Sequence, residues 1–168
     1  MADAFELLGL PARFDLEQSE IRRAHMTRVA SVHPDASGGG EQEAAALNEA
    51  RRVLESAERR ANLLLERLGG PGSDDHTLPD GFLMEIMETR ERIEAALASG
   101  DPDARAACET EADERRRAHI ERVGGLFEFG DDPGTLAAIR VELNAWRYAE
   151  RLIEQLDPDY DPGRADFG

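Results

Sequence analysis

At 168 residues, the chain can bury one sizeable core or two small ones, and it is too short for separate cofactor and substrate domains. Only nine aromatic residues are present, which disfavours a β-sandwich, whereas the abundance of Leu, Ala, Glu and Arg favours helices. All 20 basic residues are arginine, and the formal net charge of −16 disfavours a general nucleic-acid or membrane-surface role. Cys108 is the only cysteine, which excludes an intrachain disulfide and favours a reducing cytoplasm.

Apolar residues recur three or four positions apart in about six segments, which predicts an all-α fold. Residues 3–8 are expected to form a short helix that ends at Gly9 and Pro11. Asp15 is predicted to cap a second helix that runs to about Val32, where Pro34 stops it. Arg22 and Arg23 then face solvent, and the inward stripe is expected to be Ile21, Ala24, His25, Val29 and Val32.

A third helix is predicted from about Glu41 to Leu68, antiparallel to the second. Its continuous apolar stripe comprises Leu47, Ala50, Leu54, Ala57, Ala61, Leu64 and Leu68. The Gly- and Asp-rich residues 69–75 have the composition of a flexible connector, so we expect a domain of residues 1–70 and a linker of residues 71–79.

The second domain is predicted to be an antiparallel three-helix bundle over residues 80–156. Its helices are expected at 80–98, 102–123 and 135–156. Asp101-Pro102 has the pattern of a cap followed by a first-turn proline, and Gly124-Gly125 begins the last break. The tail from residue 157 to 168 has the composition of a disordered segment.

The tripeptide His33-Pro34-Asp35 lies in a Gly-rich turn between the two long helices of the first domain. Because Pro34 fixes its own φ and restricts His33, such a loop loses little entropy when it docks on a partner. Asp35 could then accept a charge-assisted hydrogen bond from an arginine of that partner. The features of the loop alone favour this docking role and a purely structural role equally. In the structural role, His33 covers the helix end and Asp35 forms a turn.

Four successive segments of this region resemble the signatures of a J-domain, in order and at the expected separations. They are residues 3–10, residues 21–24, His33-Pro34-Asp35, and Leu47-Asn48-Glu49-Ala50 with Leu54. The resemblance implies a four-helix domain that docks on a heat-shock-type chaperone ATPase of the HscA/DnaK class. It also implies that His33, Pro34 and Asp35 stimulate ATP hydrolysis by that partner.

Four positions depart from the J-domain pattern. Ala36 stands where a lysine is common, Arg28 where a leucine usually packs, and Met26 and Thr27 where basic residues often lie. The basic docking face is therefore thin, and its candidate residues are Arg22 and Arg23. The alternative for this pair is an ordinary solvated helix surface.

The helix predicted at 80–98 carries more apolar residues than one stripe needs. One stripe comprises Phe82, Ile86, Ile93 and Leu97, and a second is centred on Leu83, Met84 and Met87. Glu88 and Glu91 continue the second stripe, and adaptable methionines beside an acidic edge suit protein recognition. The alternative is that the second stripe packs against another helix of this protein.

Residues 60–65 and 78–91 resemble the bacterial HscB-type J-domain co-chaperones of iron–sulfur cluster biogenesis, and this resemblance extends over nearly the whole chain. It implies that the second stripe binds an iron–sulfur scaffold protein of the IscU class. The matching scaffold-binding positions are Leu83, Met84, Met87, Glu88, Glu91 and Tyr148. Ala95 departs from the pattern, where an acidic residue is frequent. The lack of paired cysteines matches the bacterial type rather than the human type.

Other chemistries lack support in the sequence. Gly38-Gly39-Gly40 is followed by Glu41 rather than by the Lys-Ser/Thr of a P-loop, so ATP is expected to bind only the partner. No histidine has a second ligand at helical spacing, so we expect no metal, no cofactor and no enzyme activity. One alternative stays open, a J-domain protein with another client whose bundle is a structural or dimerisation module.

Overall fold

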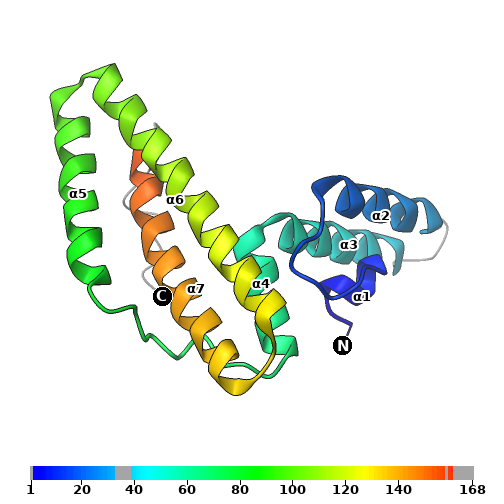
Figure 1. The fold of residues 1–168 in the computed structure, drawn as a ribbon. Coiled ribbons are helices and arrows are strands. Elements are labelled where there is room, and N and C mark those ends of the chain that lie inside the picture. Colours follow the sequence, from blue (N-terminus) through cyan, green and yellow to red (C-terminus); the bar gives the residue numbers. More distant parts are fainter. Residues whose placement is uncertain (1, 33–38, 158, 161–168) are drawn as a thin grey trace. The chain divides into compact units, whose positions relative to one another are not determined.

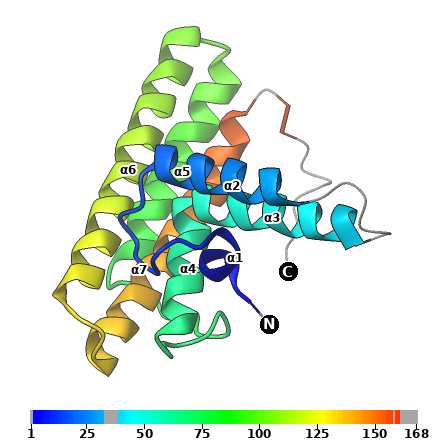
Figure 2. The ribbon, with the colours of Figure 1, turned by 90° about the vertical axis from the view of Figure 1, so that its right-hand side faces the viewer.

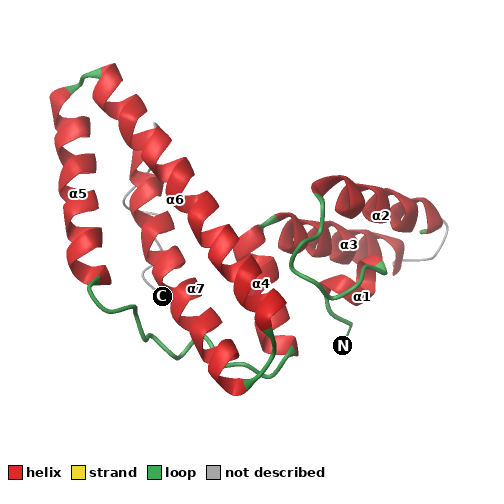
Figure 3. Ribbon diagram, in the orientation of Figure 1, coloured by secondary structure: helices red, strands yellow, loops and turns green. Residues whose placement is uncertain are grey.

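The computed structural model describes residues 2–32, 39–157 and 159–160, and the described part of the chain is helical without strands (Figures 1 and 3). The predicted all-α fold is therefore confirmed. Contacts divide the chain into two units, Met1–Gly70 and Pro71–Gly168. The helices are α1 (Ala4–Leu8), α2 (Gln18–Ser31), α3 (Gly39–Glu55), α4 (Ala57–Arg67), α5 (Phe82–Ser99), α6 (Pro102–Phe129) and α7 (Pro133–Ile153), followed by the 3₁₀ helix η1 (Glu154–Leu156).

Helix α1 is short, and capping interactions stabilise both of its ends. The Asp3 carboxylate accepts a hydrogen bond from the Glu6 backbone N–H at 3.0 Å, and the helix ends at Gly9 with φ of 67°. A Cβ on Gly9 would lie 2.5 Å from Arg28 Nη2, so the Arg28 side chain lies over the end of α1. Arg28 thus covers α1 from a position where the J-domain pattern has a leucine.

Helices α2 and α3 lie side by side in the N-terminal unit (Figure 2). The prediction that Asp15 caps α2 is wrong, because Glu17 is the capping residue and forms a capping box with Glu20. Asp15 instead accepts a hydrogen bond from Arg13 Nη1 at 3.0 Å. Asp15 with Gln18 and Glu17 with Glu20 have the same spacing, so the sequence fits a capping box at either position, and the structure forms the box at Glu17 and Glu20.

The predicted inward stripe of α2 is largely wrong, because Ile21 is the only buried residue of this helix. Val29 is 37% exposed, and Ala24, His25 and Val32 are half-buried. His25 Nε2 lies 2.9 Å from Asn48 Oδ1 on α3, so the α2–α3 contact at this level is polar. Helix α2 is therefore attached to its unit mainly through one apolar side chain.

The single third helix predicted up to Leu68 is in fact two helices, α3 and α4, separated at Ser56. The Ser56 hydroxyl accepts a hydrogen bond from the Arg59 backbone N–H at 3.3 Å and so caps α4. Buried Arg60 donates from Nε to the Phe14 carbonyl oxygen at 2.8 Å and from Nη1 to the Leu54 carbonyl oxygen. The bond to Leu54 satisfies a carbonyl at the break. The N-terminal unit thus has four helices, as the J-domain resemblance implies.

Helices α5, α6 and α7 form the antiparallel bundle that was predicted for the second unit (Figure 1). The expected cap at Asp101-Pro102 begins α6, where the Asp101 carboxylate accepts from the Asp103 N–H at 3.0 Å. The break predicted at Gly124-Gly125 is wrong, because α6 continues through both glycines to Phe129. Val123 is fully buried immediately before them, and this burial favours continuation of the helix.

Two apolar clusters hold the bundle together. Half-buried Leu78 and Leu152 contact the first cluster, and Cys108 and Leu152 contact the second. Both clusters join α5 to α7. Their buried members are Phe82, Ile86, Ala145 and Ala149 in the first, and Ile93, Ala112, Ile153 and Leu156 in the second.

A polar cluster joins α6 to α7. The rings of His119 and Trp146 stack with centroids 5.9 Å apart, and His119 Nδ1 lies 2.5 Å from Glu142 Oε1. Arg122 Nε donates to the same oxygen at 2.7 Å. Burial alone would raise the pKa of Glu142, but the hydrogen bonds from His119 and Arg122 outweigh it and lower this pKa.

The segment predicted as a flexible connector is hydrogen-bonded to α7. Arg140 Nε donates to the Pro71 carbonyl oxygen at 3.0 Å. Asn144 Nδ2 donates to the carbonyl oxygens of Asp75 and Thr77 at 2.8 and 3.0 Å. Composition alone does not reveal this anchoring, because its donors lie about 70 residues away in the sequence. The predicted tail from residue 157 to 168 lies mostly outside the described residues.

Candidate functional site

The first candidate surface, here called the α2 surface, consists of Arg22, Arg23 and Met26. Arg22 Nε lies 3.3 Å from Glu55 Oε1, and its side chain is 67% exposed. Arg23 is exposed, and its side chain has no ion-pair partner within the described chain. Met26 is 70% exposed. The structure thus exposes both predicted arginines, and Met26 adds an exposed apolar side chain about one turn farther along α2.

The tripeptide His33-Pro34-Asp35 lies outside the described residues, as does Ala36. The described chain ends before it at Val32, which caps α2, and resumes at Gly39, the first residue of α3. The role of the tripeptide therefore stays a prediction from the sequence.

The second candidate surface, here called the α5–α7 face, consists of Leu83, Met84, Met87, Glu88, Glu91 and Tyr148. Its apolar members on α5 are well exposed, with 57% of Leu83, 72% of Met84 and 61% of Met87 accessible. The opposite stripe of α5 is buried at Phe82, Ile86 and Ile93, so the helix uses one stripe for the bundle and leaves the other uncovered.

Leu97 does not continue the buried stripe as predicted, because it is 38% exposed. It lies in the last turn of α5, which ends at Ser99. Helical spacing places Leu97 on the inward side but does not reveal that Ala96, rather than Leu97, is the last buried residue of α5.

The carboxylates of α5 differ in their pairing. Glu85 Oε1 accepts from Arg115 Nη1 at 2.7 Å, and Glu94 Oε1 accepts from Arg90 Nε at 2.7 Å. Glu88 and Glu91 are exposed, and within the described residues neither side chain has an ion-pair or hydrogen-bond partner. The two carboxylates assigned to the face are thus the ones left available for a partner's cations.

Tyr148 joins the face from α7. Its ring packs edge-to-face on Phe82, with centroids 6.2 Å apart and an interplanar angle of 76°, and the residue is 45% exposed. Phe82 belongs to the buried stripe at the start of α5, so its contact with Tyr148 joins two residues that are far apart in the sequence. Ala95, which departs from the family pattern, is exposed farther along α5.

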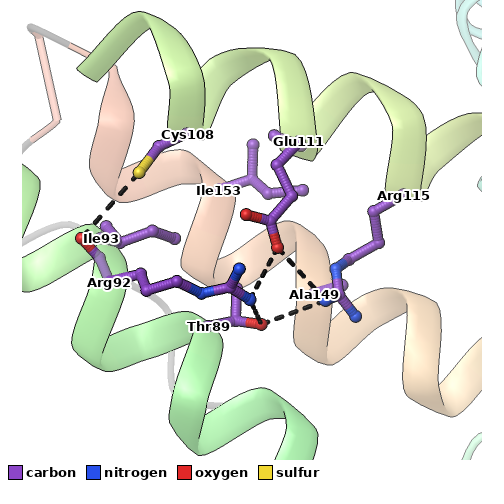
Figure 4. Close-up of a pocket in the computed structure, with 9 residues that line it drawn as sticks. Thr89, Arg92, Ile93, Cys108, Glu111, Arg115, Ala149 and Ile153 are labelled. Carbon is purple, nitrogen blue, oxygen red and sulfur yellow. Dashed lines mark hydrogen bonds and ion pairs between the residues drawn. The ribbon is translucent and has the colours of Figure 1, made fainter. Parts of the chain in front are cut away.

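A small pocket lies between α5, α6 and α7 (Figure 4). Its polar groups bind one another: Arg92 Nη2 lies 2.8 Å from Glu111 Oε1, and Arg115 Nη2 donates to Thr89 Oγ1 at 3.1 Å. Cys108 Sγ points toward the Arg92 carbonyl oxygen at 3.9 Å. Because these groups already satisfy each other, the pocket has the character of an interhelical contact.

Among residues 2–32, 39–157 and 159–160, no group of His, Cys, Asp or Glu side chains is placed to hold a metal ion. None of the helices in the same ranges combines the length and apolar character that crossing a membrane requires.

Several exposed apolar residues were not predicted from the sequence to lie on the surface, among them Met26 and Phe129. Met26 was noted only as a departure from a basic pattern, and Phe129 is 81% exposed at the end of α6, beyond the predicted end of that helix. A Met within an arginine-rich helix is a signal that could have identified Met26. The exposure of Phe129 depends on the length of α6, which local sequence did not reveal.

A four-helix N-terminal unit with an arginine-bearing α2, followed by a bundle with an exposed apolar and acidic face, fits the class of J-domain co-chaperones that the sequence resembles. A family model described as the HSCB C-terminal oligomerisation domain matches residues 78–157. The co-chaperone protein HscB homolog of Burkholderia mallei (strain SAVP1) is 34% identical over 163 residues, covering 91% of this chain and 93% of its own. The chain therefore belongs to the HscB family of co-chaperones, and the resemblance is confirmed.

Solved structures agree with this assignment. The chaperone HscB from Vibrio cholerae has a TM-score of 0.75 and 28% identity, over 92% of this chain and 95% of that one. Human co-chaperone protein HscB has a TM-score of 0.76 over 93% of this chain and 81% of that one. Since it is only 21% identical, the human protein supports the fold alone.

Proposed function

We propose that this protein is an adaptor of iron–sulfur cluster biogenesis, which holds a scaffold protein of the IscU class on the α5–α7 face. The adaptor delivers the scaffold to a heat-shock-type chaperone ATPase of the HscA/DnaK class in the cytoplasm. It stimulates ATP hydrolysis by that chaperone through His33, Pro34 and Asp35 and performs no catalysis of its own. Membership of the HscB family supports a co-chaperone role of this kind.

The observation that carries the proposal is the surplus apolar surface of α5. Leu83, Met84 and Met87 are each more than half exposed, although the buried stripe of the same helix already satisfies the bundle. Glu88 and Glu91 lie beside them, and their side chains are unpaired within the described residues. An apolar patch with an acidic edge and flexible methionines suits a protein partner that carries a basic rim.

In this proposal, residues 1–70 are the J-domain, residues 71–79 connect it, and residues 80–156 bind the scaffold. Arg22 and Arg23 contribute charge to chaperone docking. Arg22 must exchange its exposed pair with Glu55 for the partner, which costs little because exposed ion pairs contribute under about 1 kcal/mol. One chain that carries both sites raises the effective concentration of the scaffold beside the chaperone, and affinity rises without any new contact.

Two variants separate the two sites. We expect Asp35→Asn to abolish ATPase stimulation and to spare scaffold binding, whereas Met84→Ala with Met87→Ala should do the reverse. Leu97→Ala is the matched control, because it shortens an exposed apolar side chain of α5 outside the face. Calorimetric titration with purified scaffold and steady-state ATPase assays with purified chaperone measure both effects. Normal stimulation of the chaperone ATPase by the Asp35→Asn variant would contradict the J-domain assignment.

A second function is favoured by one observation, since the matching family model is described as an oligomerisation domain. In that case the α5–α7 face joins two copies of this chain, and the client is a different one. Sedimentation velocity decides between the two functions. A dimer that dissociates in Met84→Ala with Met87→Ala, together with no scaffold binding by the parent protein, would replace the first function by the second.

A further inference from the structure

The methionines of this protein are placed unusually. Of the four in the sequence, three lie in the described helices, and all three are exposed: Met26 at 70%, Met84 at 72% and Met87 at 61%. The buried apolar residues of the described chain are Ala, Phe, Leu, Ile, Val and Trp, without a single methionine. Methionine sulfur is thus concentrated on the two surfaces that we assign to partners.

A thioether in such a position is chemically accessible to peroxides. A lone pair of the sulfur attacks one oxygen of hydrogen peroxide, the O–O bond breaks, an S=O bond forms, and water leaves after proton transfer. Sulfur loses two electrons, and the peroxide gains them. The product, methionine sulfoxide, is polar and chiral where the thioether was apolar and flexible, and sulfoxide reductases reverse the step.

We propose that Met84 and Met87 form a redox modification site, at which oxidation by peroxide reversibly turns off partner binding by the α5–α7 face. This inference rests on the proposed function of that face. A sulfoxide oxygen brought into an apolar interface loses its hydrogen bonds to water without gaining others, so each oxidised side chain disfavours the bound state. The two sulfurs are three positions apart on one helix, and a partner that covers one must cover the other.

The fold itself is spared by this chemistry. The side chains that lie behind the face are Phe82, Ile86, Ala145 and Ala149, none of which contains sulfur. Oxidation therefore changes the surface and leaves the described core intact, unlike oxidation of a buried methionine, which disrupts packing. Besides the methionines, the sequence contains one other sulfur that peroxide could modify, that of Cys108, which is half-buried near the Arg92 carbonyl oxygen.

The experiment uses the full chain with Cys108→Ala, so that thiol oxidation does not contribute. The protein is treated with hydrogen peroxide, the sulfoxides are located by peptide mass spectrometry, and binding of a purified IscU-class scaffold is titrated. We expect the dissociation constant to rise at least about tenfold, with an unchanged circular dichroism spectrum, and to return after treatment with sulfoxide reductases.

Two leucine variants are matched controls, because leucine keeps the apolar volume and cannot be oxidised. In Met84→Leu with Met87→Leu, the dissociation constant for the scaffold should be the same before and after peroxide treatment, whatever the affinity of the untreated variant. Met26→Leu removes an equally exposed thioether on the α2 surface and should not protect binding.

The outcomes separate this inference from the function on which it rests. If the untreated protein does not bind the scaffold, both the proposed function and the inference are wrong. If the untreated protein binds and the doubly oxidised protein binds equally well, only the inference is wrong. Equal loss of binding in the oxidised Met84→Leu, Met87→Leu variant would also overturn the inference, since another residue would then be responsible.

Discussion

Helices α2 and α5 each carry one of the two candidate partner surfaces, but they are attached to their units in different ways. Helix α2 buries Ile21 alone, and its remaining contacts are polar or exposed. Helix α5 buries five side chains and still exposes a second apolar stripe. A helix that carries more apolar residues than its core contacts require indicates a binding face, as in α5. Helix α2 has barely enough apolar residues to pack against its own unit.

The largest effect is expected from Ile21→Ala. Removal of a fully buried isoleucine typically costs about 3 kcal/mol, and α2 has no other buried side chain to compensate. The amides of α2 should then exchange with solvent roughly a hundredfold faster, as hydrogen exchange with mass spectrometry can measure.

Ile86→Ala is the counterpart on α5, where Phe82, Thr89, Ile93 and Ala96 remain buried. We expect a smaller increase in the exchange rate of α5 amides than Ile21→Ala produces in α2. Equal increases in the amide exchange rates of the two helices would show that the number of buried side chains does not explain how α2 and α5 are attached.

An intermediate effect is expected from pH, within the C-terminal unit. Because the pKa of Glu142 is lowered in the folded protein, its charged form contributes stability that is complete above its ordinary value near 4.5. That contribution is lost as the pH falls through the lower pKa of the folded state. Glu142→Gln should therefore lose less stability than the parent protein between about pH 5 and pH 3.

Urea denaturation followed by tryptophan fluorescence measures this difference, since Trp146 is the only tryptophan and stacks on His119 in the same cluster. Glu121→Gln serves as control, because Glu121 is exposed on the same helix as His119. If the parent and Glu142→Gln lose the same stability on acidification, the hydrogen bonds of Glu142 do not contribute as described.

The smallest effect on stability is expected from Arg22→Ala. Its ion pair with Glu55 is exposed, so the free energy of unfolding should change by less than about 0.5 kcal/mol. Chaperone docking should nevertheless weaken, as it should in Arg23→Ala. A large loss of stability in thermal denaturation of Arg22→Ala would mean that ion pairs, rather than Ile21, attach α2.

Apolar spacing predicted which parts of the described chain are helical, because burial of one side is what most helices need. It could not locate the break at Ser56, since the apolar stripe stays in phase from α3 into α4. Arg60 hydrogen-bonds to the Phe14 and Leu54 carbonyls near this break, and those contacts depend on tertiary structure.

The continuation of α6 through Gly124 could not be predicted from local sequence either, because it also depends on tertiary packing. A glycine costs about 1 kcal/mol in a helix, which the burial of Val123 can outweigh.

The candidate site was more predictable than the helix ends. Leu83, Met84 and Met87 were identified from sequence because they exceed what one buried stripe requires, and their exposure agrees with that interpretation. Tyr148 came only from the family resemblance, since its packing on Phe82 brings together residues far apart in the chain. His33-Pro34-Asp35 stays a prediction.

The hydrogen bonds from Arg140 and Asn144 to the segment between Pro71 and Thr77 have a thermodynamic consequence for assembly. Fixing the backbone of a free residue costs about 1–2 kcal/mol in conformational entropy. In this protein much of that loss occurs when the C-terminal unit folds, before any partner arrives. A complex that engages both units at once therefore forms from a connector that is already ordered, and less of the binding free energy is lost to immobilising it.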